Sequence, residues 1–426
     1  MLYEVNIERN GVQAFVGTLT GSSSEDTVFA YRQEYLRSND AAPISISLPL
    51  QPEPFSPAQT RNFFDSLLPE GFTRRAVAQW IHADESDYLT ILHALGRECL
   101  GAIRIRTEGE NPQASYEPLT LRQVKELAAE GAAKSAELVT ESHLSLAGAS
   151  GKVGLYYDGE TWYLPKGTAP STHIVKLSHI RLKQIVLNEQ LALLTAKNCG
   201  LNVPDSFIVN TGTGKDEEIL LATRRYDRVF RENAGTIDGL PIPARLHQED
   251  FAQALGLSAA AKYEPQGEAY LRRMFSLLRS HSANPIEDMT RLWDQIVFHC
   301  LIGNTDAHLK NFSLLYSGDL RSVRLSPVYD VISTTVYPAS TRRLSFRIGS
   351  AASIDEITAA DFEAAAREAG LGVRMAMGRY RSMVEQFIPA LRDAAKTLSG
   401  QGFAATAELA EKILKTGGIA SAKRGV

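Results

Sequence analysis

The most informative segment of this sequence is Gly303-Asn304-Thr305-Asp306-Ala307-His308-Leu309-Lys310-Asn311. The segment follows an apolar run at residues 292–302, so it is predicted to leave a buried helix and form a loop. Within the loop, the carboxyl group of Asp306 is followed by the amide of Asn311. An Asx turn with a helix-capping aspartate would also explain this composition, so the segment alone leaves both interpretations open.

The interval from Asp306 to Asn311 is the Asp-x-x-x-x-Asn spacing of protein kinase catalytic loops. Phosphoryl transfer requires one carboxylate that faces the attacking hydroxyl group and, a few residues later, an amide that reaches the metal on the phosphates. The spacing therefore predicts Asp306 as the catalytic residue and Asn311 as a metal ligand.

A second acidic residue, Asp330, stands in the apolar segment Pro327-Val328-Tyr329-Asp330-Val331-Ile332. A carboxylate in such surroundings is costly to bury unless it is paired or binds a metal. Its distance from Asn311 along the chain resembles that of the second magnesium-binding aspartate in kinases. The alternative is an edge-strand aspartate that faces solvent.

A lysine and a glutamate form the third candidate feature. Lys176 lies on a predicted strand at residues 173–177, and Glu189 lies on the apolar stripe of a predicted helix at residues 181–198. A glutamate on an apolar face needs a cation, and a strand lysine paired with a helix glutamate positions the α- and β-phosphates in kinases. The alternative is that Lys176 is a solvated strand residue.

The small-residue segment Leu146-Ala147-Gly148-Ala149-Ser150-Gly151-Lys152 lies between two predicted strands. Small residues let backbone amides approach a phosphate, although the Walker A spacing is absent and a plain hairpin is the alternative. The small-residue hairpin, strand lysine, helix glutamate, Asp-x-x-x-x-Asn loop and buried aspartate occur in the order that protein kinases use. This order favours a kinase more strongly than any one feature does.

The length and composition indicate a globular protein of two or three packed units. The chain has 426 residues, of which 44% are hydrophobic and 22% are charged. Alternating residues predict strands at 2–7, 44–48, 102–105 and 153–157, whereas residues 353–415 have an almost continuous helical pattern. A mainly β lobe is therefore expected to precede a mainly α lobe.

The remaining bulk properties exclude several classes of protein. The net charge of −4 does not favour strong nucleic-acid binding by the chain alone. Cys99, Cys199 and Cys300 are widely spaced and indicate neither a disulfide framework nor a zinc site, which fits a reducing cytoplasm. Neither a signal peptide nor a long apolar membrane span is expected.

Over nearly its whole length the chain resembles the HipA-type serine/threonine kinases of bacterial toxin–antitoxin modules. The segments that carry the resemblance are residues 63–71, 96–102, 145–149, 171–176, 226–228, 247–250, 262–263 and 306–312. The resemblance implies an α+β, two-lobed protein-kinase-like fold with an N-terminal α/β lobe and an all-α C-terminal lobe. It divides the chain into an N-terminal subdomain at 1–108, an ATP-binding part at 109–246 and a helical lobe with the catalytic loop at 247–426.

The resemblance also implies ATP and Mg²⁺ as ligands. Asp306 would be the catalytic base, Asn311 and Asp330 would hold the metal, and Ser145 would be phosphorylated by the kinase itself. The residues that would contact ATP are Ala147, Gly148, Ala149, Ser150, Gly151, Lys152, Lys176, Glu189, Arg224, Arg225, Tyr226, His308, Lys310 and Tyr329.

Two departures from the family pattern concern nucleotide binding. Residues 149–152 read Ala-Ser-Gly-Lys where relatives have Gln-Glu before the lysine, and Arg224 stands where an acidic residue is usual. The implied partners are a HipB-like helix-turn-helix antitoxin, operator DNA reached through that antitoxin, and a protein substrate in translation such as an aminoacyl-tRNA synthetase. The alternatives are a small-molecule kinase and a catalytically idle corepressor, and the intact Lys176, Asp306, Asn311 and Asp330 argue against idleness.

Overall fold

The computed structural model describes residues 2–96, 98–110, 112–130, 151–178, 182–232 and 234–422. The chain folds into two compact units that interleave along the sequence. The first comprises Met1–His179, Val209–Ala259 and Leu314–Val323, and the second comprises Ile180–Ile208, Ala260–Ser313 and Arg324–Val426. The three consecutive segments predicted from the sequence divide the chain differently and stay a prediction.

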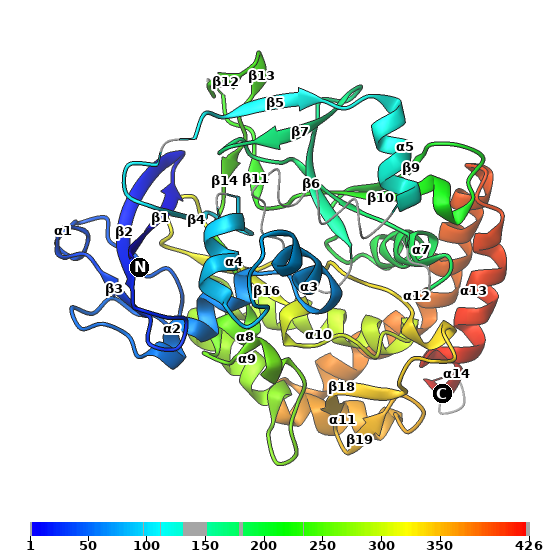
Figure 1. Cartoon of the computed structure of the whole chain (residues 1–426). Helices are drawn as coiled ribbons and strands as arrows, with labels where there is room; N and C mark the ends of the chain where they lie inside the picture. The colour runs from blue at the N-terminus through cyan, green and yellow to red at the C-terminus, as the bar shows by residue number, and fades with distance from the viewer. Residues whose placement is uncertain are drawn as a thin grey trace. The chain divides into compact units, whose positions relative to one another are not determined.

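The first unit begins with an antiparallel sheet in the order β3-β2-β1-β4 (Figure 1). Its strands form because alternate residues, such as Val5 and Ile7, are buried. The helix α2 begins with a capping box in which Ser56 and Gln59 bond each other's backbone. The elements are β1 (Leu2–Arg9), β2 (Val12–Thr20), β3 (Val28–Tyr31), α1 (Gln33–Leu36), α2 (Pro57–Phe64), η1 (Asp65–Leu67), α3 (Gly71–Trp80), α4 (Tyr88–Leu95) and β4 (Ile103–Arg106).

The strand expected at residues 44–48 is wrong, because the structure has turns and one isolated bridge there. Side chains satisfy the backbone of this segment in place of a neighbouring strand. Tyr31 donates its hydroxyl hydrogen to the Leu48 carbonyl at 2.6 Å, and Glu249 accepts the Ile46 N–H at 3.0 Å. The alternation that predicted a strand therefore reflects alternate burial in a turn.

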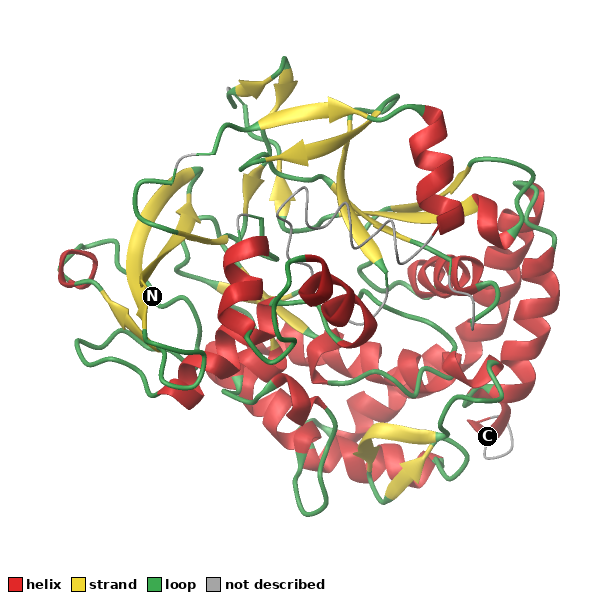
Figure 2. Ribbon diagram, in the orientation of Figure 1, coloured by secondary structure: helices red, strands yellow, loops and turns green. Residues whose placement is uncertain are grey.

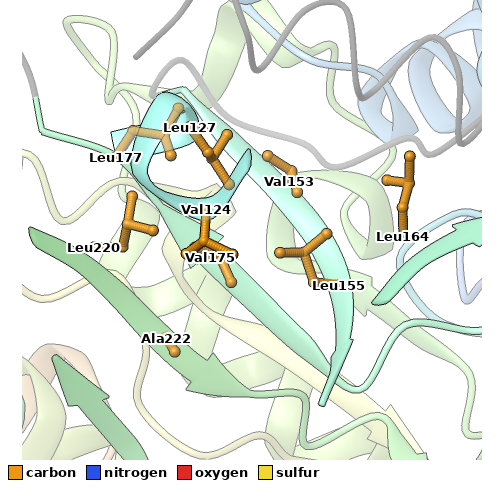
Figure 3. Close-up of a cluster of buried hydrophobic side chains, with 9 residues drawn as sticks. All are labelled: Val124, Leu127, Val153, Leu155, Leu164, Val175, Leu177, Leu220 and Ala222. Carbon is orange, nitrogen blue, oxygen red and sulfur yellow. The ribbon is translucent and has the colours of Figure 1, made fainter. Parts of the chain in front are cut away.

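A six-stranded sheet follows, with its strands in the order β5-β7-β6-β8-β10-β9. Figure 3 shows Val124 and Leu127 of α5 packed on the apolar face of this sheet, where Val153, Val175 and Leu220 are buried. The elements are β5 (Ser115–Pro118), α5 (Leu121–Glu130), β6 (Lys152–Tyr157), β7 (Trp162–Lys166), β8 (His173–Lys176), β9 (Ser206–Asn210), η2 (Asp216–Glu218) and β10 (Ile219–Arg224).

Short strands complete the β structure of this part of the chain. They pair as β11 with β14, β12 with β13, and β15-β16-β17. The bounds are β11 (Arg228–Val229), β12 (Thr236–Ile237), β13 (Leu240–Pro241), β14 (Ala244–Arg245), β15 (Gln248–Asp250), α8 (Phe251–Ala254), η3 (Ala259–Lys262), β16 (Ser313–Tyr316) and β17 (Val323–Leu325).

The second unit is mainly helical, as Figure 2 shows, with α12 packed against α7, α10 and α13. The helices predicted over residues 353–415 are confirmed. The prediction that this lobe is all-α is wrong in one detail, because the lobe contains the hairpin β18–β19, in which Ile348 pairs with Ala351. The elements are α7 (Ile185–Asn198), α9 (Tyr270–His281), α10 (Pro285–Ile302), η4 (Leu309–Asn311), η5 (Thr334–Val336), β18 (Arg343–Ile348), β19 (Ala351–Ser353), α11 (Ala359–Glu368), α12 (Val373–Gly400), α13 (Ala405–Thr416) and α14 (Ile419–Ala422).

The three cysteines, Cys99, Cys199 and Cys300, are buried as free thiols. Within the ranges that the structure describes, no helix combines the length and the apolar character that a membrane span requires.

Candidate active site

The catalytic loop starts where α10 ends at Gly303, which adopts the left-handed conformation with φ of 84°. Its carbonyl accepts the Thr334 hydroxyl at 2.9 Å and the Thr335 N–H at 3.2 Å. A Cβ atom at this position would lie 2.2 Å from Thr335 Oγ1. The loop therefore leaves the helix in a direction that only glycine permits.

Asp306 is the one exposed residue of the segment 303–311, and its eight neighbours in that segment are buried. Its N–H donates to Asn304 Oδ1 at 3.1 Å, and its carbonyl accepts from the His308 N–H at 2.9 Å. The Asx turn that was the alternative interpretation is thus present. It is the local structure that presents the Asp306 carboxylate to solvent, so the two interpretations are compatible.

Asn311 is held to the same carbonyl group. Its Nδ2 donates to the Asp306 carbonyl at 3.0 Å, and its side chain is buried. This bond orients the amide so that Nδ2 faces the loop and Oδ1 is the end suited to a metal. An amide oxygen is a ligand that Mg²⁺ accepts.

Asp330 lies on a bend, half-buried, and has a left-handed backbone with φ of 56°. Few residues other than glycine adopt this conformation, and such residues concentrate at functional sites. The bend is anchored on both sides, because the Val328 N–H donates to the Asn202 carbonyl and the Ser333 N–H donates to Asn188 Oδ1, both in the same unit. The edge strand considered as an alternative is absent at Asp330.

A buried histidine connects Asp330 with the catalytic loop. Burial lowers the pKa of His299 to about 4, and the negative charge of Asp330 opposes this shift. Asn304 Nδ2 lies 3.0 Å from His299 Nδ1 and donates to it, since an amide nitrogen has no acceptor capacity. His299 is therefore neutral, and it holds the Asx turn by accepting the hydrogen bond from Asn304. Sequence reasoning missed this role, because His299 falls within an apolar helical run.

Tyr329, His308 and Lys310 were expected near ATP. The Tyr329 hydroxyl donates to the Lys310 carbonyl at 2.9 Å and lies 2.6 Å from Ser313 Oγ, so it braces the end of the loop. His308 and Lys310 are buried. Their contacts with nucleotide stay predictions.

Two lysines of the first unit face each other across neighbouring strands. Lys152 on β6 and Lys176 on β8 are direct partners in the antiparallel register. Both alternate with the core residues Val153 and Val175, so they lie on the opposite face of the sheet. Lys152 is buried and Lys176 is half-buried. Their contacts with phosphate stay predictions.

The rest of the expected phosphate loop is only partly visible. The Gly151 carbonyl accepts the Leu177 N–H at 3.2 Å, which continues the ladder between β6 and β8. Ala147, Gly148, Ala149 and Ser150, together with the expected modification site Ser145, lie outside the described residues.

Glu189 is buried on α7, as its place on the apolar stripe predicted. The residue before it, Asn188, is bonded through both ends of its amide to the Ser333 backbone, at 2.9 and 2.8 Å. The helix is thereby tied to the segment that follows Asp330. Lys176 belongs to the first unit and Glu189 to the second, and their pairing stays a prediction.

Arg225 has a structural role in place of the nucleotide contact predicted for it. All five of its N–H groups are engaged, by Asp227, Glu98, Ser171 Oγ and the Cys99 carbonyl. The side chain is fully buried, which leaves no donor for a nucleotide. The two residues that flank Arg225 are not part of this buried network. Arg224 is exposed at the end of β10, and the Tyr226 hydroxyl donates to Gln248.

The site also contains a residue that the sequence did not single out as chemical. Tyr263 donates its hydroxyl hydrogen to Asp306 Oδ1 at 2.8 Å. The signal in the sequence was the segment Lys262-Tyr263, which was noted only as a family-like motif. Tyr263 and Asp306 are far apart in the sequence, so no local sequence pattern could predict this contact.

The fold and this loop define a protein-kinase-like phosphotransferase. The HipA N-terminal domain family matches residues 12–106, and the HipA-like C-terminal domain family matches residues 144–394. The chain belongs to the HipA family of serine/threonine protein kinases.

Individual relatives agree with this assignment. The Sinorhizobium fredii protein Y4mE is 33% identical over 380 residues, with 87% of each chain covered. The serine/threonine-protein kinase toxin HipA of Shewanella oneidensis is 28% identical over 348 residues, covering 78% of this chain and 76% of that protein. The fold is similar, with a TM-score of 0.80 and 22% sequence identity, to a chain of the solved complex of HipA, HipB and operator DNA from Shewanella oneidensis MR-1. The match covers 99% of this chain and 97% of that chain.

Proposed function

We propose that this kinase transfers the γ-phosphoryl group of magnesium-bound ATP to a serine or threonine hydroxyl group of a protein in translation, such as an aminoacyl-tRNA synthetase, and thereby acts as a toxin. The observation that carries the proposal is the exposure of Asp306 in an otherwise buried loop whose Asp306 carbonyl is bonded to the Asn311 amide. In this arrangement Asp306 accepts the proton of the acceptor hydroxyl and orients its attack.

The residues present fit ATP and Mg²⁺. Asn311 and Asp330 supply the hard oxygen atoms that Mg²⁺ prefers, and two protein ligands suffice when phosphates and water complete the coordination. Bound magnesium neutralises charge on the phosphates. Lys152 and Lys176 hold the phosphates through their ammonium groups.

We further propose a helix-turn-helix antitoxin as partner, through which the chain is held on operator DNA. Support comes from the similarity in fold to the solved complex that contains HipA, HipB and operator DNA. With a net charge of −4, the chain alone should bind DNA weakly, and a basic partner should supply most phosphate contacts. Gel shifts with and without the protein encoded next to it test this. Tight binding by the isolated chain would contradict it.

The proposal includes transfer to the chain's own Ser145. A phosphate there would add about −1.5 to −2 charges beside the nucleotide phosphates and repel them, so the modified protein should be inactive. Mass spectrometry after incubation with ATP and Mg²⁺ should find phosphate on Ser145. Phosphate found only on Ser142 or Ser150 would overturn this part of the proposal.

The experiment that tests the catalytic assignment compares Asp306→Asn with wild type, using γ-labelled ATP and Mg²⁺. Loss of the base should lower transfer by about 10² or more while nucleotide binding survives. Asp393→Asn is the matched control, because Asp393 is exposed on α12 of the same unit. Activity of Asp306→Asn above roughly half of the wild-type rate would overturn the assignment. Inactivity of all three proteins would favour a catalytically idle corepressor, and transfer to a small metabolite alone would favour a small-molecule kinase.

A further inference from the structure

Tyr263 places a hydroxyl group directly on the carboxylate proposed to activate the acceptor. The bond to Asp306 Oδ1 is 2.8 Å long, and Tyr263 is 45% exposed. Its ring meets the His308 ring edge-on, with 5.2 Å between the centroids and 84° between the planes. The Lys262 ammonium group lies 5.4 Å from the centroid of the same ring. The tyrosine is thus oriented by contacts with its ring as well as by its hydroxyl group.

A single residue of β18 ties Tyr263 and Asp306 together. The carbonyl of Ser345 accepts the N–H of Glu264, the residue after Tyr263, at 2.8 Å. The hydroxyl group of Ser345 donates to the carbonyl of Thr305, the residue before Asp306, at 2.9 Å. Two segments that are remote in sequence are therefore fixed to one point, which sets the separation of the two side chains.

Glu264 strengthens this attachment. Its carboxylate accepts the N–H of Arg347 at 3.0 Å and the N–H of Tyr270 at 2.8 Å, so the turn is joined both to β18 and to the start of α9. The Tyr270 hydroxyl group also donates to the carbonyl of Ala261 at 2.6 Å. The turn that carries Tyr263 is thus bonded on both sides of the tyrosine.

We propose that Tyr263 is a positioning residue for phosphoryl transfer, holding Oδ1 of Asp306 so that Oδ2 faces the acceptor hydroxyl group. The inference rests on the proposed function, in which Asp306 is the base. The terminal torsion of an aspartate is soft, so a carboxylate at the surface samples a broad range of orientations. A donor on one oxygen restricts that range, so that the other oxygen stays directed toward the acceptor hydroxyl group.

The test is Tyr263→Phe, which removes the hydroxyl group and keeps the ring. Self-phosphorylation of the full chain, with γ-labelled ATP and Mg²⁺, supplies the rate. Loss of one hydrogen bond to a charged group should lower the maximum rate roughly tenfold. The half-saturating ATP concentration should not change, because Tyr263 does not hold nucleotide.

Tyr270→Phe is the matched control, since it removes a phenolic hydroxyl group that bonds the carbonyl of Ala261 in the same turn without touching Asp306. It should lower thermal stability and leave the maximum rate close to that of wild type. Equal losses of maximum rate in both variants would mean that Tyr263 is only structural. A Tyr263→Phe protein that matches wild type would overturn this inference alone, provided that Asp306→Asn is inactive. An active Asp306→Asn protein would overturn the proposed function, and this inference with it.

Discussion

Lys152 and Lys176 stand directly opposite each other in the antiparallel ladder of β6 and β8, on the face of the sheet away from its apolar core. Two ammonium groups on one face of a ladder can each make a charge-assisted contact with a phosphate. The role proposed for these lysines as phosphate contacts gives a prediction that can be measured.

The first prediction concerns this pair. Lys176→Met should weaken ATP binding by roughly tenfold or more, because one charge-assisted contact is lost. The unliganded protein should unfold at nearly the same temperature as wild type, because Lys176 is half-buried and lies on the face of β8 away from the apolar core. Calorimetry and thermal unfolding measure the two effects. Lys166→Met, on β7 of the same sheet, is the control and should bind ATP normally. Unchanged ATP affinity in Lys176→Met would remove the lysine from the site.

The second prediction concerns the metal. Asp330→Asn keeps a residue type that tolerates the left-handed backbone and replaces only the charged oxygen. Nucleotide binding by this variant should become weak and nearly independent of magnesium, as measured by titration with and without a chelator. Asp294→Asn serves as the control, because Asp294 bonds Arg379 away from the loop. A full magnesium dependence in Asp330→Asn would exclude Asp330 as a ligand.

The sequence predicted the features of the site that depend on local periodicity and spacing. Alternation placed Lys176 opposite the core face of β8, and the helical pattern placed the buried Glu189 on α7, whose residues are buried nearly all round. The end of α10 at Gly303 also followed from the apolar run before it. In each case the side chain's environment is set by neighbours within one strand or a few helical turns.

Polar contacts between distant segments could not be predicted in this way. Arg225 lies beside Tyr226 in the sequence and was expected near nucleotide, but its donors are taken by residues as remote as Glu98 and Ser171. Tyr263 was assigned no chemistry, yet it bonds Asp306. Periodicity reports which face of an element is buried, and it contains no information about which polar group lies opposite.

The third prediction concerns pH. Burial raises the pKa of Glu249 from 4.5 to about 7, although Ser45, Tyr316 and the Ile46 N–H donate to its carboxylate and oppose the shift. An acid with a raised pKa contributes its full stability below about pH 4.5, loses it as the pH rises to about 7, and changes no further above that. Wild type should therefore lose roughly 3 kcal/mol through this group across that interval.

Glu249→Gln should flatten this part of the stability profile, because the amide does not ionise. Denaturant unfolding at pH 5 and pH 8 measures the difference. Glu385→Gln, at an exposed position of α12, should keep the wild-type pH dependence. The groups that act on Glu249 include those of Ser45, Tyr316, Asp250 and Tyr31, and they are unchanged in the variant. A Glu249→Gln profile as steep as that of wild type would contradict the prediction.

The fourth prediction tests how the catalytic loop is fixed to α10. Gly303→Ala places a Cβ atom 2.2 Å from Thr335 Oγ1 and 2.9 Å from the Gly417 backbone, at a residue with φ of 84°. The left-handed conformation and the overlap together should cost about 2–4 kcal/mol of unfolding free energy.

The rate of phosphoryl transfer by Gly303→Ala should fall by more than the loss of folded protein accounts for. The Gly303 carbonyl accepts hydrogen bonds from Thr334 and Thr335, and a shift of this carbonyl moves Asp306. Gly378→Ala is the matched control: Gly378 lies within α12, where an added Cβ meets open space. That variant should gain about 0.5–1 kcal/mol, because alanine is favoured over glycine inside a helix. Thermal unfolding and self-phosphorylation of both variants separate the two effects. Equal stability of the two proteins would show that the loop leaves α10 without the constraint described here.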